Sequence, residues 1–592
     1  MASQTKLQSW APPAALLLLA SWMLRGWRER WIPHDEGTLA GSALRVLAGQ
    51  LPHRDYDEVY SGGLAYLHAA LFAAFGERLD VLRLALVIPG LLLFLPCLYL
   101  MARRFAQPWA AAAIAAVAFA WGLPNYPAAL PSWFNLMFAL AAGEALLRSG
   151  EGQRPRTWRV LAGVCIGLSI SIKIAGIYLL AAALVFLAME EQRRAQSLDS
   201  ELRGRLRGLH ASILVLLAAT LIGLLGTHAG APELLHFFLP PCAATALLLV
   251  GERRSRGSRN ERLQRLVGLG APLLLGALLG CAPLVLTFLA SGALGDLMRG
   301  LFILPATRLD HASWAPPPIA AALWSVPWIL LLALAHKLPG RLCAVLVTAL
   351  CLALPFGGQL GVYRAIWAGA QPLPSLLVLL AALLVVRASM PPVAQWLVLA
   401  TAFTGLLQFP FSAPLYVAYV APLAVLLGAW LGRDWHPRAA AAGLAFFGLF
   451  AVLWLHTGTL ADFGWGYFQQ RDLRPLASPR AQLWVHASEV REVDGLLEYL
   501  EQKAPPGLLW CGPDAPEIYA LSGREDPTRG PFEFFAGDSK QQRLTFLEER
   551  APKVIVINTQ PGFSAPYSPE FQALLQQRYK TWVRMGRFLV GH

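Results

Sequence analysis

Charged residues are scarce in this sequence. They make up only 14% of the 592 residues, whereas apolar residues make up 56%; a typical soluble domain has about 25% charged residues. The composition therefore indicates a membrane protein.

Motifs that would identify several other classes of protein are missing. The seven cysteines provide no disulfide framework, because six lie in apolar runs and Cys511 stands alone near the C-terminus. No Walker, GxGxxG, HExxH or CxxC pattern occurs in the context it requires. The lack of a nucleotide-binding signature argues against an ATP-driven pump.

The basic residues that are present indicate a membrane topology. A net charge of +13 could mean nucleic-acid binding. However, the arginines and lysines form small groups between apolar runs, and short basic loops face the cytoplasm. We therefore predict a protein of the bacterial inner membrane with no nucleic-acid partner. The groups lie at residues 103–104, 148–159, 193–207, 253–265, 337–341, 387 and 433–438.

An apolar stretch between two cytoplasmic groups crosses the membrane an even number of times, which predicts a series of hairpins. With one span before residue 25, one at 81–101 and a last one at 439–456, the total is about 13–15 spans. The fold class is thus a mainly α polytopic membrane protein with a cytoplasmic N-terminus and a membrane domain of residues 1–456. The outer turns are predicted at Leu123–Ser132, near Lys173, and at Thr227–His236, Ser291–Pro318, Phe356–Pro372 and Gln408–Pro414.

Residues 457–592 are predicted to form a small C-terminal α/β domain on the outer, periplasmic side. Amphipathic and buried-strand patterns alternate along this tail. The predicted helices are Val490–Gln502, Pro513–Leu521, Arg543–Arg550 and Pro569–Arg578, and the predicted strands are Gly507–Cys511, Lys553–Asn558 and Trp582–Val590.

The first outer loop, residues 25–80, concentrates acidic residues. Asp35 and Glu36 form one cluster and Asp55, Asp57 and Glu58 a second, so that five of the 36 Asp and Glu residues fall within 24 positions. Carboxylates at a membrane face can act as a general base or hold a divalent cation near a lipid phosphate.

Two interfacial helices are predicted in this loop. Leu39, Ala43, Val46 and Leu47 repeat at helical spacing after Asp35, and a second apolar helix runs over residues 64–75 between glycines. Asp35 then lies at a helix N-terminus, where the helix dipole favours an ionised carboxylate and attracts phosphate. We expect the two acidic clusters to meet above the membrane.

Each of these features has a simpler structural explanation. Asp35 and Glu36 could cap the helix, and the second cluster could be an ordinary solvated turn. Lys173 is costly within an apolar run, which favours function, but it could also reach the interface along its own side chain. His34 lacks a second histidine at the spacing of a metal site.

The same loop carries a series of short motifs that resembles the pattern of polytopic glycosyltransferases of the GT-C class. These include the protein mannosyltransferases and the lipid A aminoarabinose transferases. Gly167–Lys173 and Gln408-Phe409-Pro410 are similar to later family segments. In the first loop, two residues rather than one separate Gly49 from Pro52. The series reads Asp35-Glu36, Gly49-Gln50-Leu51-Pro52-His53-Arg54-Asp55, Asp57-Glu58, Gly62-Gly63, Tyr66-Leu67-His68-Ala69 and Phe75-Gly76.

The resemblance implies an inverting transfer from a polyprenyl-phosphate sugar donor to a lipid, glycan or protein acceptor at the periplasmic face. It makes Asp35 the general base. Glu36, with Asp57 or Glu58, would orient the acceptor or bind a divalent metal where one is used, and Asp55 belongs to the same substrate-binding group.

The leaving lipid phosphate needs cationic partners. Aminoarabinose transferases carry a lysine directly after the glutamate of the second motif, where this sequence has Val59. The phosphate site is then supplied from elsewhere, and an aminoarabinose donor is in question. The candidates are Arg54, Lys173, Arg299, Arg308 and Arg364.

The alternative is a transporter or flippase of a lipid-linked molecule. Transporters place ionisable groups inside their spans, near the midplane of the membrane. Glu144 and Lys173 are the clearest charges within the apolar runs, and the acidic clusters lie outside them. This distribution favours an enzyme.

Overall fold

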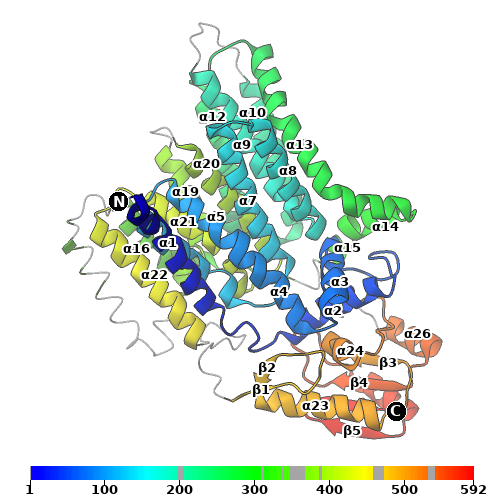
Figure 1. Cartoon of the computed structure of the whole chain (residues 1–592). Coiled ribbons are helices and arrows are strands. Elements are labelled where there is room, and N and C mark those ends of the chain that lie inside the picture. Colours follow the sequence, from blue (N-terminus) through cyan, green and yellow to red (C-terminus); the bar gives the residue numbers. More distant parts are fainter. Residues whose placement is uncertain are drawn as a thin grey trace.

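Helices dominate the computed structural model of the chain (Figure 1). A bundle of helices occupies most of the molecule, and the C-terminal strands lie together at one end of it. The structure describes residues 2–197, 206–308, 313–334, 339, 341–342, 345, 348, 367–385, 390–457, 472–530 and 540–592.

The first third of the chain contains two helices of the outer loop between longer apolar ones. A short π-helical segment at Gly90–Phe94 joins α4 to α5, so that residues 79–103 form one long helix. The helices are α1 (Ala2–Met23), α2 (Pro33–Leu47), α3 (Gly63–Phe75), α4 (Leu79–Pro89), α5 (Leu95–Arg103), α6 (Pro108–Ala120), α7 (Pro131–Glu151), α8 (Pro155–Ile172) and α9 (Gly176–Gln196).

The remaining helices of the bundle follow along the chain. They are α10 (Arg207–Leu225), α11 (Ala231–Glu233), α12 (Leu239–Glu252), α13 (Arg259–Ala290), α14 (Leu294–Met298), α15 (Leu304–Arg308), α16 (Ile319–Leu334), α19 (Leu373–Val385), α20 (Pro392–Thr404), α21 (Ala421–Leu431) and α22 (Pro437–Thr457).

The predicted polytopic fold is confirmed. Within the described residues four helices are long and apolar enough to cross a membrane, and seven further apolar helices are shorter. The helices break at the predicted outer turns near residues 123–130, 173–175, 229–230 and 405–420. The predicted turn at 291–318 instead contains α14 and α15, and most of the one at 356–372 lies outside the described residues. The count of 13–15 spans stays a prediction.

A buried ion-pair network ties the helices together at the end away from the C-terminal strands. Arg262 of α13 donates hydrogen bonds to Glu191 of α9 and Glu252 of α12 at 2.7–3.1 Å. All three side chains are buried. Figure 1 shows the loop ends of α10, α12 and α13 at the top and the C-terminal strands at the bottom.

The tail is an α/β unit. Its four-stranded sheet has the order β3-β4-β6-β5, with β3 parallel to β4 and the other pairs antiparallel, and β1 and β2 pair separately. The strands are β1 (Leu473–Pro475), β2 (Trp484–His486), β3 (Leu509–Gly512), β4 (Val554–Asn558), β5 (Trp582–Met585) and β6 (Phe588–Gly591), and the helices are α23 (Ala487–Gln502), α24 (Pro516–Ser522), α26 (Lys540–Arg550) and α27 (Pro569–Arg578).

One element of the tail differs from its prediction. The single strand predicted over Trp582–Val590 is wrong, because the chain reverses at Gly586 and forms the hairpin of β5 and β6. Gly586 has φ of 55°, a left-handed conformation that glycine adopts without steric cost. The short pair of β1 and β2 was not predicted.

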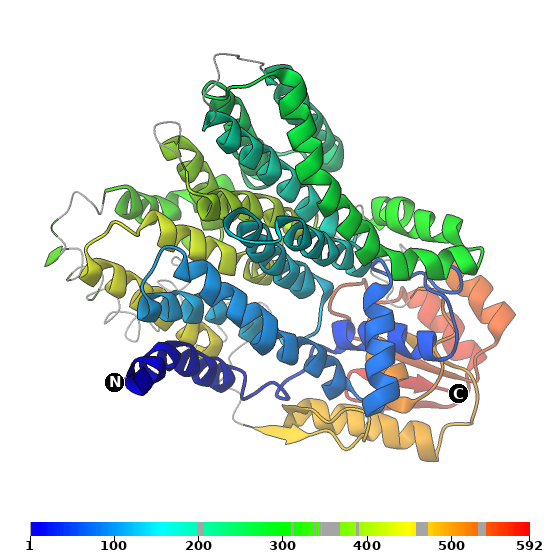
Figure 2. The same cartoon turned by 45° about the horizontal axis from the view of Figure 1, so that its top comes forward.

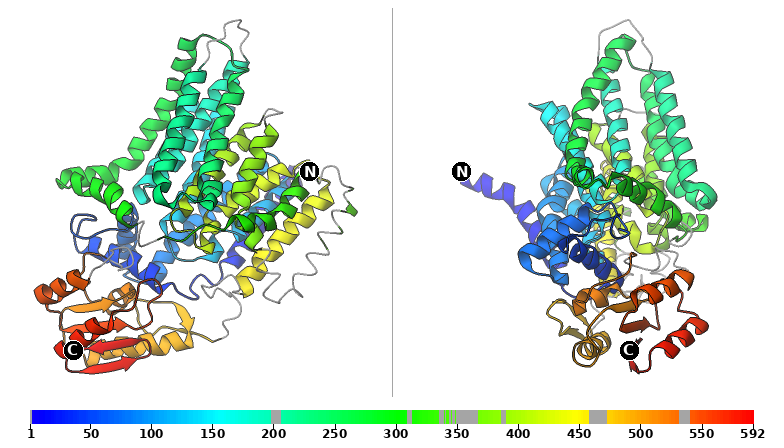
Figure 3. Two further views of the ribbon diagram at one scale, coloured as in Figure 1. Left: turned by 180° about the vertical axis from the view of Figure 1, so that it is seen from behind. Right: turned by 90° about the vertical axis from the view of Figure 1, so that its right-hand side faces the viewer.

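The tail packs directly on the first outer loop. A β-carbon added to Gly37 of α2 would lie 2.3 Å from the backbone nitrogen of Glu517 in α24, so glycine permits the close approach of these helices. Arg45 of α2 forms an ion pair with Asp526 at 2.8 Å. Figure 2 shows α2 and α3, in blue, lying against the orange and red tail, and Figure 3 shows the same contact from two other sides.

Candidate active site

Asp35 lies in the first turn of α2, where the sequence predicted it. Pro33 occupies the first turn, a position that needs no backbone N–H, and acidic residues in that turn complement the helix dipole. The residue at the N-cap is Ile32, which makes no side-chain capping bond. Glu36 accepts the backbone N–H of Ile32 at 2.8 Å, so the capping explanation fits Glu36 rather than Asp35.

The carboxylate of Asp35 is partly open and faces hydroxyl and imidazole groups. Its side chain is 23% exposed, and its Oδ1 lies 3.7 Å from Nε2 of His34. The hydroxyl of Tyr126, from the loop between α6 and α7, donates a hydrogen bond to Oδ2. Burial, reinforced by the charge of Asp35, raises the pKa of Tyr126 well above its ordinary value. Tyr126 is therefore a neutral hydroxyl that positions the carboxylate.

Aromatic side chains from the late outer loop lie around this group. Burial and the charge of Asp35 also raise the pKa values of Tyr416 and Tyr419. Their rings are 5.1 Å apart, and Tyr419 lies 4.6 Å from Trp133 of α7. Trp133 in turn donates a hydrogen bond from its indole to the carbonyl of Tyr126 at 3.1 Å. Three outer loops thus meet at Asp35.

Lys173 lies close to the same cluster. It occupies the turn between α8 and α9, and its Nζ donates to Oγ of Ser132 at 3.0 Å, next to Trp133. Burial lowers the pKa of Lys173 to about 8, so the side chain is still mostly cationic at neutral pH. The structure therefore connects one predicted cation, through Ser132, to the start of α7, which also carries Trp133.

Glu36 has different surroundings from its neighbour. Its carboxylate is fully buried and pairs with the guanidinium of Arg83 at 2.6 and 2.9 Å. Arg83 also donates to the backbone carbonyls of Trp27, Glu29 and Arg30. Because these contacts use both oxygens, the structure places Glu36 in a scaffold that holds the start of α2.

Asp55, the first acid of the second cluster, does not join Asp35 in the way the sequence predicted. Asp55 accepts hydrogen bonds from Arg54 and from the backbone of Leu51, beyond the C-terminal end of α2. The two ends of a 15-residue helix are about 20 Å apart. Hydrogen bonds from Arg54 hold the pKa of Asp55 below its usual range. The structure thus separates Asp55 from Asp35.

The other two acids of this cluster have structural partners. Asp57 pairs with Arg529 of the tail at 3.1 Å. Glu58 is buried, and its Oε1 accepts the backbone N–H groups of Val59 and Tyr60 at 2.8 and 3.1 Å. Two of the three acids therefore shape the loop or bind the tail, and Arg54 is engaged with the third.

The remaining predicted cations are not all placed. Arg299 is exposed on the segment between α14 and α15, and Arg364 lies outside the described residues. In the part of the chain that the structure describes, no three His, Cys, Asp or Glu side chains form a group that could hold a metal ion.

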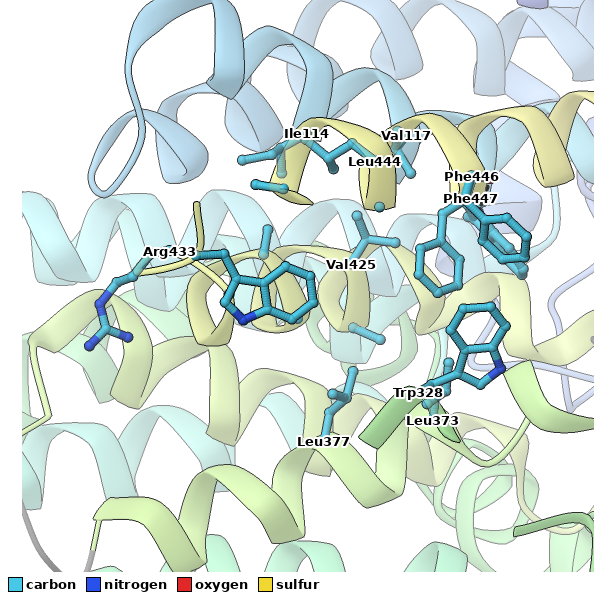
Figure 4. A pocket seen from close by; sticks show the side chains of 18 of the residues that line it. Ile114, Val117, Trp328, Leu373, Leu377, Val425, Arg433, Leu444, Phe446 and Phe447 are labelled. Carbon is cyan, nitrogen blue, oxygen red and sulfur yellow. Dashed lines mark hydrogen bonds between the residues drawn. The ribbon is translucent and has the colours of Figure 1, made fainter. Parts of the chain in front are cut away.

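An apolar cavity of about 440 Å³ lies inside the bundle (Figure 4). Its walls come from α6, α19, α21 and α22, and Arg433 stands at one end of it, opposite the rings of Trp328 and Phe447. Trp121 and Val417 also line it. Val417 directly follows Tyr416 in the late outer loop.

Sequence reasoning missed Tyr126, Tyr416 and Tyr419. The outer turns that carry them were predicted, but a tyrosine in such a turn has no distinguishing pattern of its own. Only the packing of the turns against each other assigns these residues to the site.

The sequence comparison agrees with the predicted resemblance. Residues 63–222 match the family of dolichyl-phosphate-mannose-protein mannosyltransferases. The chain is similar to the GT-C class of polytopic glycosyltransferases. The matched residues begin at α3, after Asp35, and cover roughly a quarter of the chain. No curated protein sequence matches it.

Solved structures of membrane glycosyltransferases are also similar. The oligosaccharyltransferase of Archaeoglobus fulgidus, tethered to an acceptor peptide, is 13% identical and aligns over 94% of this chain and 70% of its own, with a TM-score of 0.44. ArnT of Cupriavidus metallidurans in the apo state is 15% identical over 100% and 98%, with a TM-score of 0.38. The same protein bound to undecaprenyl phosphate has a TM-score of 0.35, at 15% identity over 98% and 96%.

Proposed function

We propose that the protein is an inverting membrane glycosyltransferase that moves a sugar from a polyprenyl-phosphate donor to an acceptor hydroxyl. The observation that carries this proposal is the carboxylate of Asp35, which is partly open and oriented by Tyr126. The family match of residues 63–222 supports the same reaction class.

Asp35 is the general base of this reaction. Its carboxylate takes the proton of the acceptor hydroxyl while that oxygen attacks the anomeric carbon of the donor. The bond between the anomeric carbon and the phosphate oxygen breaks, and its electron pair leaves with the polyprenyl phosphate. Positioned general bases contribute about 10²–10⁴ in rate, and single displacement inverts the anomeric centre.

Lys173 stabilises the leaving phosphate. A cation next to developing negative charge acts strongly where water is partly excluded. Glu36 and Tyr126 are positioning residues, because Glu36 acts on the start of α2 through Arg83 and Tyr126 acts on the carboxylate of Asp35.

The apolar cavity supports a lipid-linked donor. Its apolar walls match the hydrocarbon of an isoprenoid chain, and they include Val417, which directly follows Tyr416 in the chain. A polyprenyl tail held there would place its phosphate near the site at the membrane surface. A transporter would hold its ionisable groups near the midplane of the membrane. Here Glu144, in the C-terminal half of α7, pairs with Arg104 and Arg148, and Lys173 lies in a turn.

We also propose that the site and the tail are periplasmic and the N-terminus cytoplasmic, in a bacterial inner membrane. A cysteine introduced at the exposed Thr581 of the tail should react with an impermeant thiol reagent in intact cells, and one at Ser197, after α9, should not. Labelling at Ser197 alone would reverse the orientation.

The reaction itself can be tested in proteoliposomes with polyprenyl-phosphate sugars. A glycosyltransferase releases polyprenyl phosphate and forms a product of inverted anomeric configuration, detectable by chromatography and NMR. A flippase would move the donor between leaflets and leave it intact. Donor movement without bond cleavage would therefore overturn the proposal.

A further inference from the structure

A loop of the tail reaches the first turn of α2. Residues 559–567 connect β4 to α27, and their central aromatic residue is Phe563. The ring of Phe563 meets the ring of His34 edge to face, with centroids 4.4 Å apart. His34 directly precedes Asp35, so this loop forms one wall of the site at the proposed base.

The loop is held in this position by a buried aspartate. Asp514 follows β3, and its Oδ2 accepts the backbone N–H groups of Phe563 and Ser564 at 2.8 and 2.6 Å. Its Oδ1 accepts the hydroxyl of Ser564. Asp514 is buried. The carboxylate of Asp514 thus accepts three hydrogen bonds from the loop and fixes the backbone that presents Phe563.

A second aromatic residue faces Phe563 from the membrane domain. The ring of Phe411 lies 6.5 Å from that of Phe563 and 5.5 Å from that of Tyr416. Backbone hydrogen bonds at 3.0 and 2.9 Å link Trp314 to Pro410 and Ser412, on either side of Phe411. The tail and the membrane domain therefore each present an aromatic ring next to a neighbour of Asp35, Phe563 at His34 and Phe411 at Tyr416.

Building on the proposed function, we infer that the acceptor is a saccharide and that Phe563 with His34 forms its binding face. A pyranose ring has one face of C–H groups, which packs on an aromatic ring, and a rim of hydroxyl groups that needs polar partners. This part of the molecule offers both kinds of group, because the rings of Phe563 and Phe411 meet beside His34 and Tyr416, and Asp35, which follows His34, bonds to the hydroxyl of Tyr126. Ligand sites combine aromatic walls and a few placed polar groups in this way.

The same arrangement fits the other acceptor classes less well. An extended peptide is usually bound through its backbone by a free strand edge or a groove, whereas this wall comes from a short loop, a helix start and a turn. A lipid acceptor would enter from the bundle, and the apolar cavity lies there rather than under the tail. The side facing the tail is therefore assigned to the saccharide.

Binding can be measured without turnover, which separates this inference from the proposed reaction. Methyl glycosides of common cell-envelope sugars are titrated against the full-length protein in detergent by saturation-transfer NMR. At least one should bind, and Phe563→Ala should weaken its Kd about 3- to 10-fold, the range that an aromatic contact provides. Phe563→Trp should restore binding, because it keeps an aromatic face.

Two further variants complete the test. Asp514→Ala should weaken the same Kd because it releases the loop, whereas Phe546→Ala removes a tail ring that packs on Trp510 and should leave the Kd unchanged. Glycosides that bind Phe563→Ala as tightly as the wild type would overturn the inference. The inference would also be overturned if peptides that contain serine or threonine bound the protein and no glycoside did. Failure of the proposed reaction would instead show as intact donor in the proteoliposome assay.

Discussion

The two acidic clusters of the first outer loop are alike in composition and different in environment. In the first, Asp35 meets a tyrosine hydroxyl and an imidazole, whereas Glu36 is fully buried against Arg83. In the second, Asp55 and Asp57 pair with arginines and Glu58 accepts backbone N–H groups. Of these five carboxylates, Asp35 is partly exposed and contacts a tyrosine hydroxyl and an imidazole rather than an arginine, so that it could accept a proton. The density of acidic residues therefore indicates the region, and the partners of each carboxylate single out Asp35 as the candidate base.

The largest effect is expected from breaking the buried pair of Glu36 and Arg83. Glu36→Gln leaves the Arg83 guanidinium buried without its counter-charge, and removing one partner of such a pair costs about 3–5 kcal/mol of stability. Thermal unfolding in detergent should show a large fall in Tm. Asp57→Asn is the matched control, and a Tm of Glu36→Gln equal to that of the control would contradict the scaffold role.

Asp35→Asn should affect activity and leave the fold intact. The amide keeps the size of the side chain but cannot accept the acceptor's proton, so sugar transfer should fall by about 10²-fold or more. The measurement is transfer from a competent donor in proteoliposomes, with Tm and donor binding determined in parallel. Asp55→Asn should keep most of the activity. If Asp35→Asn transfers sugar at nearly the wild-type rate, the comparison between the two clusters loses its basis.

Glu517 of the tail can be compared with Glu36, because it is also a buried carboxylate but lies farther from its arginine. It lies on α24 against α2, 3.7 Å from Arg587, and burial raises its pKa to about 7. Between the unfolded pKa near 4.5 and about 7, the folded protein holds a proton that the unfolded chain has lost, so stability falls as pH rises. Glu517→Gln should reduce this pH dependence by about 1–2 kcal/mol. Unfolding followed at pH 5.5 and pH 8 measures it, and identical profiles for the two proteins would refute it.

The smallest effect is expected at Asp57 and Arg529. Both side chains are partly exposed, and such pairs contribute about 0–1 kcal/mol. Arg529→Gln should therefore lower Tm slightly and leave the donor reaction almost unchanged. A double-mutant cycle with Asp57→Asn measures the coupling. A coupling as large as the effect of Glu36→Gln would show that the second cluster is also a main anchor of the structure.

Local sequence predicted the helices, most of the turns and the position of Asp35. Apolar runs, prolines and glycines are local signals, and α2, α3 and the turn at Lys173 form where these signals place them. The acidic loop and the α/β character of the tail were also predicted from the sequence. The hairpin at Gly586 was not, because alternating apolar residues fit one strand as well as two.

The sequence by itself therefore determined a helical membrane protein with an acidic outer loop that carries a candidate base. Only the tertiary structure decided that Glu36 is buried by Arg83, that Tyr126 orients Asp35, and that Phe563 of the tail lies beside His34. These partners are separated by 47, 91 and several hundred positions along the chain. Periodicity and capping act over a few residues, whereas the environment of a carboxylate depends on whichever distant segments pack against it.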